Sequence, residues 1–120
     1  MGSSQRKGAM FEWDCADYIS RRTGADVIPK RPGGVNDKGD LHGVKFMGKR
    51  VTVECKNCRK MELSDWVEQA EDERGNDDGD YGIVIHKRKG KGQKSFGDTY
   101  VTMTLDTFLA MSVGGADLLY

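Results

Sequence analysis

Alternating apolar and polar side chains mark the segment Arg50-Val51-Thr52-Val53-Glu54-Cys55-Lys56 as a β-strand with two unlike faces. Because strand side chains alternate with a period of two residues, positions 51, 53 and 55 point to one side and positions 52, 54 and 56 to the other. Residues 40–46 precede this segment across the turn Met47-Gly48-Lys49, and together they predict a β-hairpin. We expect one face of the second strand to join the core and the other to carry polar chemistry.

Patterns on the N-terminal side of the hairpin predict one helix and one short strand. Apolar residues at helical spacing indicate an amphipathic helix over residues 8–22 that stops near Gly24. Val27 and Ile28 indicate a short strand, and residues 32–38 a glycine-containing loop. We leave residues 1–5 out of the fold prediction, as a start that is disordered or derived from an expression vector.

The middle of the chain predicts a second helix followed by a buried strand. Ser64 is the expected N-cap of this helix, and Gly75 is the expected stop. The apolar run at residues 81–85 has the pattern of a buried strand. The residues expected on the inward face of the helix are Trp66, Val67 and Ala70.

The last third of the chain completes the predicted order α-β-β-β-α-β-β-α. Residues 100–104 alternate like a strand, and Thr104 is the expected cap of a final helix through Leu105, Phe108 and Leu109. Residues 114–120 are expected to be a frayed tail. This order predicts an α/β fold with a mixed central β-sheet flanked by helices.

Length and charge bound the class of protein. The 120 residues suit one domain over residues 1–120, and 32% of them are charged with a formal net charge of zero. That total hides two poles, because acidic residues crowd the stretch 62–80 and five basic residues lie between 87 and 94. Such runs fit a solvated surface as well as a surface for a polyanion.

The three cysteines indicate a reducing environment. They are an odd number, and no secretory signal or long apolar run accompanies them, so we expect a cytoplasmic protein without a membrane partner. Cys55-Lys56-Asn57-Cys58 is a C-x-x-C sequence, which zinc sites and redox proteins also use. No second C-x-x-C or histidine pair completes four ligands, which favours Cys55 as a small buried apolar residue.

Asp40, Glu54 and Lys56 carry the chemistry of the predicted hairpin. Asp40 opens the first strand, and Glu54 and Lys56 share a face of the second, so the hairpin can bring two carboxylates and an ammonium together. Carboxylate oxygens suit Mg²⁺ or Mn²⁺, and a divalent ion removes their mutual repulsion. The alternative is a solvent-facing Glu–Lys strand pair, worth only about a few tenths of a kcal/mol.

The same residues resemble a known catalytic motif. Gly39-Asp40-Leu41 followed by Val51-Thr52-Val53-Glu54-Cys55-Lys56-Asn57 is similar to the bipartite motif of the PD-(D/E)XK nuclease superfamily, with Gly39 in place of the proline. Within it, the chain most resembles the Holliday-junction resolvases of archaeal type and their relatives in bacteriophages of actinobacteria. The likeness runs from Lys7-Gly8 through the last helix and includes Phe11-Glu12.

The resemblance implies a restriction-endonuclease-like core and Mg²⁺-dependent hydrolysis of phosphodiester bonds in branched DNA, with Mn²⁺ able to substitute. It assigns metal binding to Asp40, Glu54 and the peptide oxygen of Cys55. It also assigns the catalytic lysine to Lys56 and a supporting carboxylate to Glu12. Residue 69, a glutamine, matches one that some members place near the site, or it has a surface role. The implied setting is a phage-encoded enzyme in the bacterial cytoplasm.

A nuclease site gives the basic residues a role as contacts to DNA phosphates, which carry no sequence information. Symmetric cutting of a four-way junction needs two active sites related by a twofold axis, so we expect a homodimer. The alternatives are another nuclease of the same fold, such as a nickase or a restriction-like enzyme, and a catalytically silent DNA-binding module. The expected DNA contacts are Arg6, Lys7, Lys30, Arg31, Lys87, Arg88, Lys89, Lys91 and Lys94.

Overall fold

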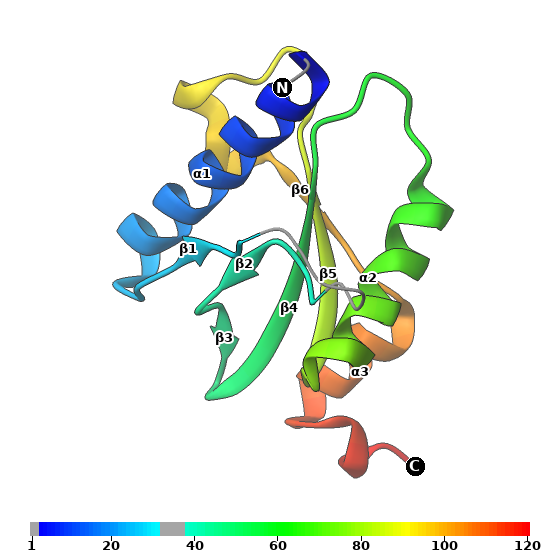
Figure 1. Cartoon of the computed structure of the whole chain (residues 1–120). Helices are drawn as coiled ribbons and strands as arrows, with labels where there is room; N and C mark the ends of the chain where they lie inside the picture. The colour runs from blue at the N-terminus through cyan, green and yellow to red at the C-terminus, as the bar shows by residue number, and fades with distance from the viewer. Residues whose placement is uncertain (1–2, 32–37) are drawn as a thin grey trace.

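A computed structural model describes residues 3–31 and 38–120, with side chains from Arg6 onward, and shows an α/β fold with a mixed four-stranded sheet between helices (Figure 1). Except for Lys38, the predicted loop 32–38 lies outside the described residues. The elements, with η for a 3₁₀ helix, are α1 (Ser3–Thr23), β1 (Ile28–Pro29), β2 (Leu41–His42), β3 (Lys45–Phe46), β4 (Lys49–Lys56), α2 (Leu63–Asp77), β5 (Tyr81–His86), η1 (Gln93–Asp98), β6 (Tyr100–Thr102), α3 (Leu105–Val113) and η2 (Ala116–Leu118).

Strands β4 and β5 form the centre of the sheet. They pair in parallel from Val51 opposite Tyr81 to Lys56 opposite His86, and α2 makes the crossover between them. β3 and β6 pair antiparallel on the two outer sides, so the strand order is β3-β4-β5-β6, while β1 and β2 form a separate ladder. Every residue of β5 is buried, as predicted for a strand covered on both faces.

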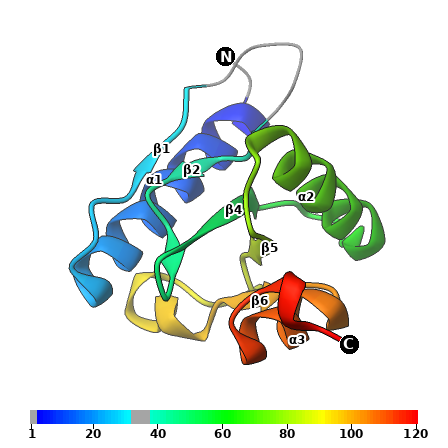
Figure 2. The ribbon, with the colours of Figure 1, turned by 90° about the horizontal axis from the view of Figure 1, so that it is seen from below.

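Helices α1 and α2 lie on opposite sides of β4 and β5 (Figures 1 and 2). On the α1 side, Phe11 and Cys15 pack with positions 51, 53 and 55 of β4 in the larger hydrophobic cluster. On the α2 side, Trp66 and Ala70 pack against Val84 in a smaller cluster. The predicted alternation of β4 is therefore confirmed. Its polar face, however, is covered by α2 and not by solvent.

The predicted hairpin is only partly right. Lys45 and Phe46 pair with the start of β4 across the expected turn. The chain before them turns away at Gly43 (φ 102°), where a Cβ would lie 2.4 Å from the carbonyl oxygen of Asp26. Strand β2 consequently pairs with β1 and not with β4, and Asp40 precedes a strand instead of opening one half of the hairpin.

Helix α2 differs from the prediction at both ends. Its N-cap is Glu62, so Ser64 lies inside the helix, and the chain stays helical through Gly75 to Asp77. Asp78 adopts the left-handed conformation (φ 54°) as the C-cap, and its N–H bonds the last turn. Because this non-glycine residue ends the helix, Gly75 is not the stop.

The first and last helices follow the predictions more closely. α1 ends just before Gly24, as expected, although it begins earlier than predicted, at Ser3. Thr104 caps α3, with its Oγ1 accepting a hydrogen bond from the N–H of Thr107 at 3.0 Å. The expected frayed tail instead forms η2, and Leu119 packs against the larger cluster. No helix in the described part of the chain is long and apolar enough to cross a membrane.

Candidate active site

Two hydrogen bonds fix Asp40 against the edge of β4. Its backbone N–H donates to the carbonyl oxygen of Val53, and its Oδ2 accepts from the N–H of Cys55, both at 2.7 Å. Gly39 (φ 91°) allows this close approach, because a Cβ there would lie 3.0 Å from the carbonyl oxygen of Val53. Asp40 therefore reaches the neighbourhood of Glu54, although the hairpin expected to bring them together is not formed.

Glu54 lies in a cluster of carboxyl groups under α2, and only 3% of the residue is exposed. The pKa of Glu54 is raised to about 12. Burial is the largest cause, followed by hydrogen bonding with Asp40 and Glu73 and then by the charges of these two residues. Its carboxyl therefore keeps a proton at neutral pH when no cation is bound. Its Oε2 is buried without a hydrogen-bond partner, at a cost of about 1–3 kcal/mol that a cation would remove.

The carboxylate of Glu73 in α2 was not among the predicted site residues. Glu73 is 2% exposed, and its Oε1 accepts a hydrogen bond from Nε2 of Gln69 at 2.8 Å. Gln69 thus reaches the site through Glu73. A signal for Glu73 was present in the sequence, because it continues the helical stripe of Trp66 and Ala70. A carboxylate at a position with core spacing indicates either a buried partner or a site.

Lys56 and the carbonyl of Cys55 belong to the same strand as Glu54. Lys56 is half-buried and follows Glu54 by two residues, so their side chains share one face of β4. The N–H and C=O groups of one strand residue point to the same edge. The carbonyl of Cys55 therefore points to the edge where its N–H meets Asp40.

Cys55 also connects the site to α1. A hydrogen bond with Cys15 and burial raise the pKa of the Cys55 thiol, with smaller contributions from the charges of Cys15, Asp40 and Glu12. Glu12, half-buried on α1, therefore lies near the side chain of Cys55. A thiol that resists ionisation is a poor zinc ligand or redox group, and Cys58 is exposed while Cys55 is buried. Cys55 is the small core residue that the sequence favoured.

The donor atoms around Asp40 fit magnesium. Within residues 3–31 and 38–120, no group of three or more His, Cys, Asp or Glu side chains is placed so that it could hold a metal ion by itself. Mg²⁺ does not require one, because it keeps several waters and is held by one or two carboxylates together with substrate phosphates. Asp40, Glu54 and the carbonyl of Cys55 offer oxygen donors of this kind.

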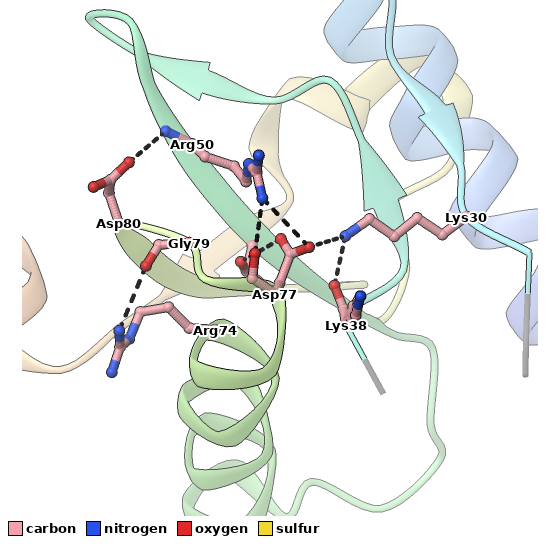
Figure 3. A network of polar contacts seen from close by, with 8 residues as sticks. Lys30, Lys38, Arg50, Arg74, Asp77, Gly79 and Asp80 are labelled. Atoms are coloured by element: carbon pink, nitrogen blue, oxygen red, sulfur yellow. Dashed lines mark hydrogen bonds and ion pairs between the residues drawn. The ribbon is translucent and has the colours of Figure 1, made fainter. Parts of the chain in front are cut away.

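A network centred on Asp77 holds the end of α2 against β4 and the end of β1 (Figure 3). Thr52 Oγ1 donates to Asp77 Oδ2 at 3.0 Å, and Arg50 donates to the Asp77 carbonyl at 2.7 Å. Lys30 Nζ lies 3.1 Å from Asp77 Oδ1, and the Lys30 N–H donates to the carbonyl of Asp40 at 2.8 Å. The network therefore ties α2 to the chain segment that carries Asp40.

Three of the predicted DNA contacts line one open pocket of about 410 Å³. Arg6 and Lys7 come from the first turns of α1, and Lys87 follows β5. The N–H of Lys87 donates to the carbonyl of Lys56 at 3.0 Å, so the pocket lies next to the end of β4. The remaining lining residues are Met10, Phe11, Asp14 and Asn57.

The other predicted DNA contacts are arranged differently. The ammonium of Lys30 belongs to the network of Figure 3. Arg88 lies over the ring of Tyr100, 4.2 Å from its centroid, and Lys91 lies 4.0 Å from the carboxylate of Asp98, so both help to hold the loop after β5. The three predicted DNA contacts that belong neither to the pocket nor to these structural contacts are exposed: Arg31, Lys89 and Lys94.

Comparison of the chain with known protein families, with curated protein sequences and with solved structures gives no match. A functional assignment therefore depends on the residues and their geometry. The structure brings Asp40 and Glu54 together, adds Glu73, places Lys56 on the same face of β4 as Glu54, and places Glu12 near the side chain of Cys55. It divides the basic residues among a pocket, structural contacts and exposed positions.

Proposed function

We propose that this protein is a Mg²⁺-dependent DNA endonuclease with a restriction-endonuclease-like core of the PD-(D/E)XK type. The observation that carries the proposal is the bond from the Cys55 N–H to Asp40 beside the buried carboxyl of Glu54. The parallel pair β4–β5, joined through α2 and flanked by Asp40, supports the proposed core. A purely structural role does not account for buried carboxyl groups side by side, because apolar residues there would be more stable.

Each residue of the site has a proposed task. Asp40, Glu54 and the Cys55 carbonyl would hold the metal ion, and Glu54 would give up its proton to do so, because a cation would offset the neighbouring negative charge. When bound, Mg²⁺ supplies positive charge at the scissile phosphate and lowers the pKa of a water molecule. Lys56 orients that water or stabilises charge on the phosphate. Glu12 supports the site from α1.

The proposed substrate is branched DNA, with a four-way junction cut on two strands by a homodimer. The resemblance to Holliday-junction resolvases, which runs from Lys7-Gly8 through the last helix, supports this substrate. A twofold axis would present two active sites to the junction. Apolar side chains on α3 are exposed, including Leu105 (71%) and Phe108 (57%). Contiguous exposed apolar residues mark interaction surfaces, so α3 is the candidate contact between the two copies.

Cleavage of a labelled four-way junction beside a linear duplex of the same arm sequences tests the proposal. We expect paired symmetric nicks in the junction with Mg²⁺ or Mn²⁺, lost in Asp40→Asn and Lys56→Ala. Asp72→Asn, which changes an exposed carboxylate on α2, should cut normally. Equal cutting of the duplex would instead indicate a nickase or restriction-like nuclease. Tight binding without cutting would contradict catalysis and leave a DNA-binding module.

A further inference from the structure

The pocket that Arg6 and Lys87 line lies where two parallel strands end. Lys56 and His86 form the last register pair of β4 and β5, and the residues immediately after them, Asn57 and Lys87, both line the pocket. The start of α1 forms the other wall, and Figure 1 shows this end of α1 beside the ends of both strands, at the top of the view. The space beyond the carboxyl ends of parallel strands is a common ligand site in α/β sheets.

The side chains of the pocket suit a phosphate group. Arg6, Lys7 and Lys87 supply three cations against the single carboxylate of Asp14, and the amide of Asn57 adds hydrogen-bonding groups. All three cationic residues are exposed, and none of them forms an ion pair within the described part of the chain. Cations gathered without partners repel one another, and a bound anion would remove that repulsion.

We propose that this pocket binds a phosphate group of the DNA strand that is cut, at a place next to the scissile phosphate. Asn57 follows Glu54 by three residues, about 10 Å along a strand at about 3.3 Å per residue. A DNA strand that crosses the carboxylate site can therefore reach the pocket with a neighbouring phosphate. Arg6 can bind two phosphate oxygens at once, and Lys87 adds a point charge. The inference rests on the proposed function for the identity of the ligand as DNA.

Binding of a fluorescent four-way junction without divalent ions, measured over a range of KCl concentrations, tests the pocket separately from cleavage. Lys87→Gln and Arg6→Gln should each weaken binding and reduce the slope of log affinity against log salt by about 0.9. Asp14→Asn should have the opposite effect and strengthen binding, because it removes the negative charge among the lining residues. The matched controls, Lys45→Gln on β3 and Asp17→Asn on α1, change exposed residues outside the pocket and should leave the slope unchanged.

The inference is overturned if the pocket variants bind like the controls, or if Asp14→Asn gives no gain. Thermal unfolding of each variant checks that the fold is retained. Junctions with and without 5′-phosphates separate the two sources of a phosphate group. A loss confined to phosphorylated ends indicates a terminal phosphate, and an equal loss indicates an internal one.

Cleavage with Mg²⁺ is scored independently of this binding. If the wild-type protein binds the junction through the pocket but does not cut it, the proposed nuclease function fails and the pocket inference stands. If the protein cuts while the pocket variants bind like the controls, the pocket inference alone fails. Absence of any DNA binding contradicts both.

Discussion

The two faces of strand β4 are both buried, yet only one is ordinary core. On the α1 side, Val53 (0% exposed) and Cys55 (9%) join the larger hydrophobic cluster. On the α2 side, Thr52 (0%) and Glu54 (3%) are equally inaccessible. Thr52 is satisfied by Asp77, whereas Glu54 keeps one buried oxygen without a hydrogen bond. The α2 face therefore carries an energetic cost that the α1 face does not, and such costs are common at functional sites.

Glu54→Gln should give the largest effect on the polar face of β4, with a loss of cleavage and a gain of stability. An amide is a much weaker metal ligand than a carboxylate, so we expect Mg²⁺-dependent DNA cleavage to fall by at least about 100-fold. Without metal at neutral pH, the same variant should unfold at a higher temperature than wild type, because an amide does not have to take up a proton on folding as the carboxyl of Glu54 does beside Asp40 and Glu73. Cleavage rates and metal-free thermal unfolding measure the two effects. A fully active but less stable variant would contradict the comparison.

Val53→Ala probes the apolar face and should change stability in the opposite direction. Loss of a fully buried side chain leaves a cavity, so the free energy of unfolding should fall by about 2 kcal/mol. Cleavage well below the unfolding temperature should stay near wild type, because this side chain points away from the carboxylates. Urea unfolding beside the cleavage assay checks both expectations. A cleavage loss as large as that of Glu54→Gln would show that the two faces are not separable.

The pH dependence of stability should also report the polar face. The raised pKa of Glu54, near 12 against an ordinary 4.5, gives a contribution that is fully present below pH 4.5 and is lost as pH rises toward 12. Burial lowers the pKa of His86, so the titration of His86 changes stability only below its ordinary pKa of 6.5. The pKa of the Cys55 thiol is raised, so its titration changes stability only above the ordinary 9.0. Between about pH 7 and about pH 8.5, the metal-free protein should therefore lose up to about 1.4 kcal/mol per pH unit.

Denaturant unfolding at several pH values in this window, without divalent ions, measures the slope. Glu54→Gln should remove most of it, while Val53→Ala should lower stability equally at each pH. A slope that survives in Glu54→Gln would assign the titration to another group.

Glu73→Gln should have the smallest effect of these variants, and its Mn²⁺ affinity tests whether the metal site extends into α2. Removal of one negative charge beside Glu54 should weaken Mn²⁺ binding by about tenfold, equivalent to about 1.4 kcal/mol. Calorimetric titration with Mn²⁺ measures this against Glu68→Gln, which changes an exposed carboxylate on the same helix. Equal Mn²⁺ affinity in both variants would confine the centre to the edge of β4.

Much of the fold could be predicted because its signals are local. The alternation of β4, the apolar run of β5, the stop at Gly24 and the cap at Thr104 each depend on a few adjacent residues. The end of α2 could not be predicted in this way. Its last turn is held by the contacts of Asp77 with β4, so the helix runs past Gly75, a residue that by itself favours a stop.

The candidate site was predicted in part, and partly for a wrong reason. Glu54 and Lys56 share a face of β4 as expected. Asp40 reaches Glu54 through the close passage of Gly39 along β4, not through a hairpin strand. Glu73 was missed although it continues the helical stripe of Trp66 and Ala70, because a charged residue within an acidic stretch is usually exposed to solvent.

By itself the sequence determined which segments alternate, which strand is buried and which residue types could bind a metal, because these properties depend on side chains close together in the chain. Only the tertiary structure decided that Glu73 of α2 lies beside Glu54, and that Arg6 and Lys87 share a pocket while Lys30 pairs with Asp77. Those contacts join residues far apart in the chain. They form because α1 and α2 must each cover one face of the sheet, and that packing depends on the burial of the whole domain and not on any local pattern.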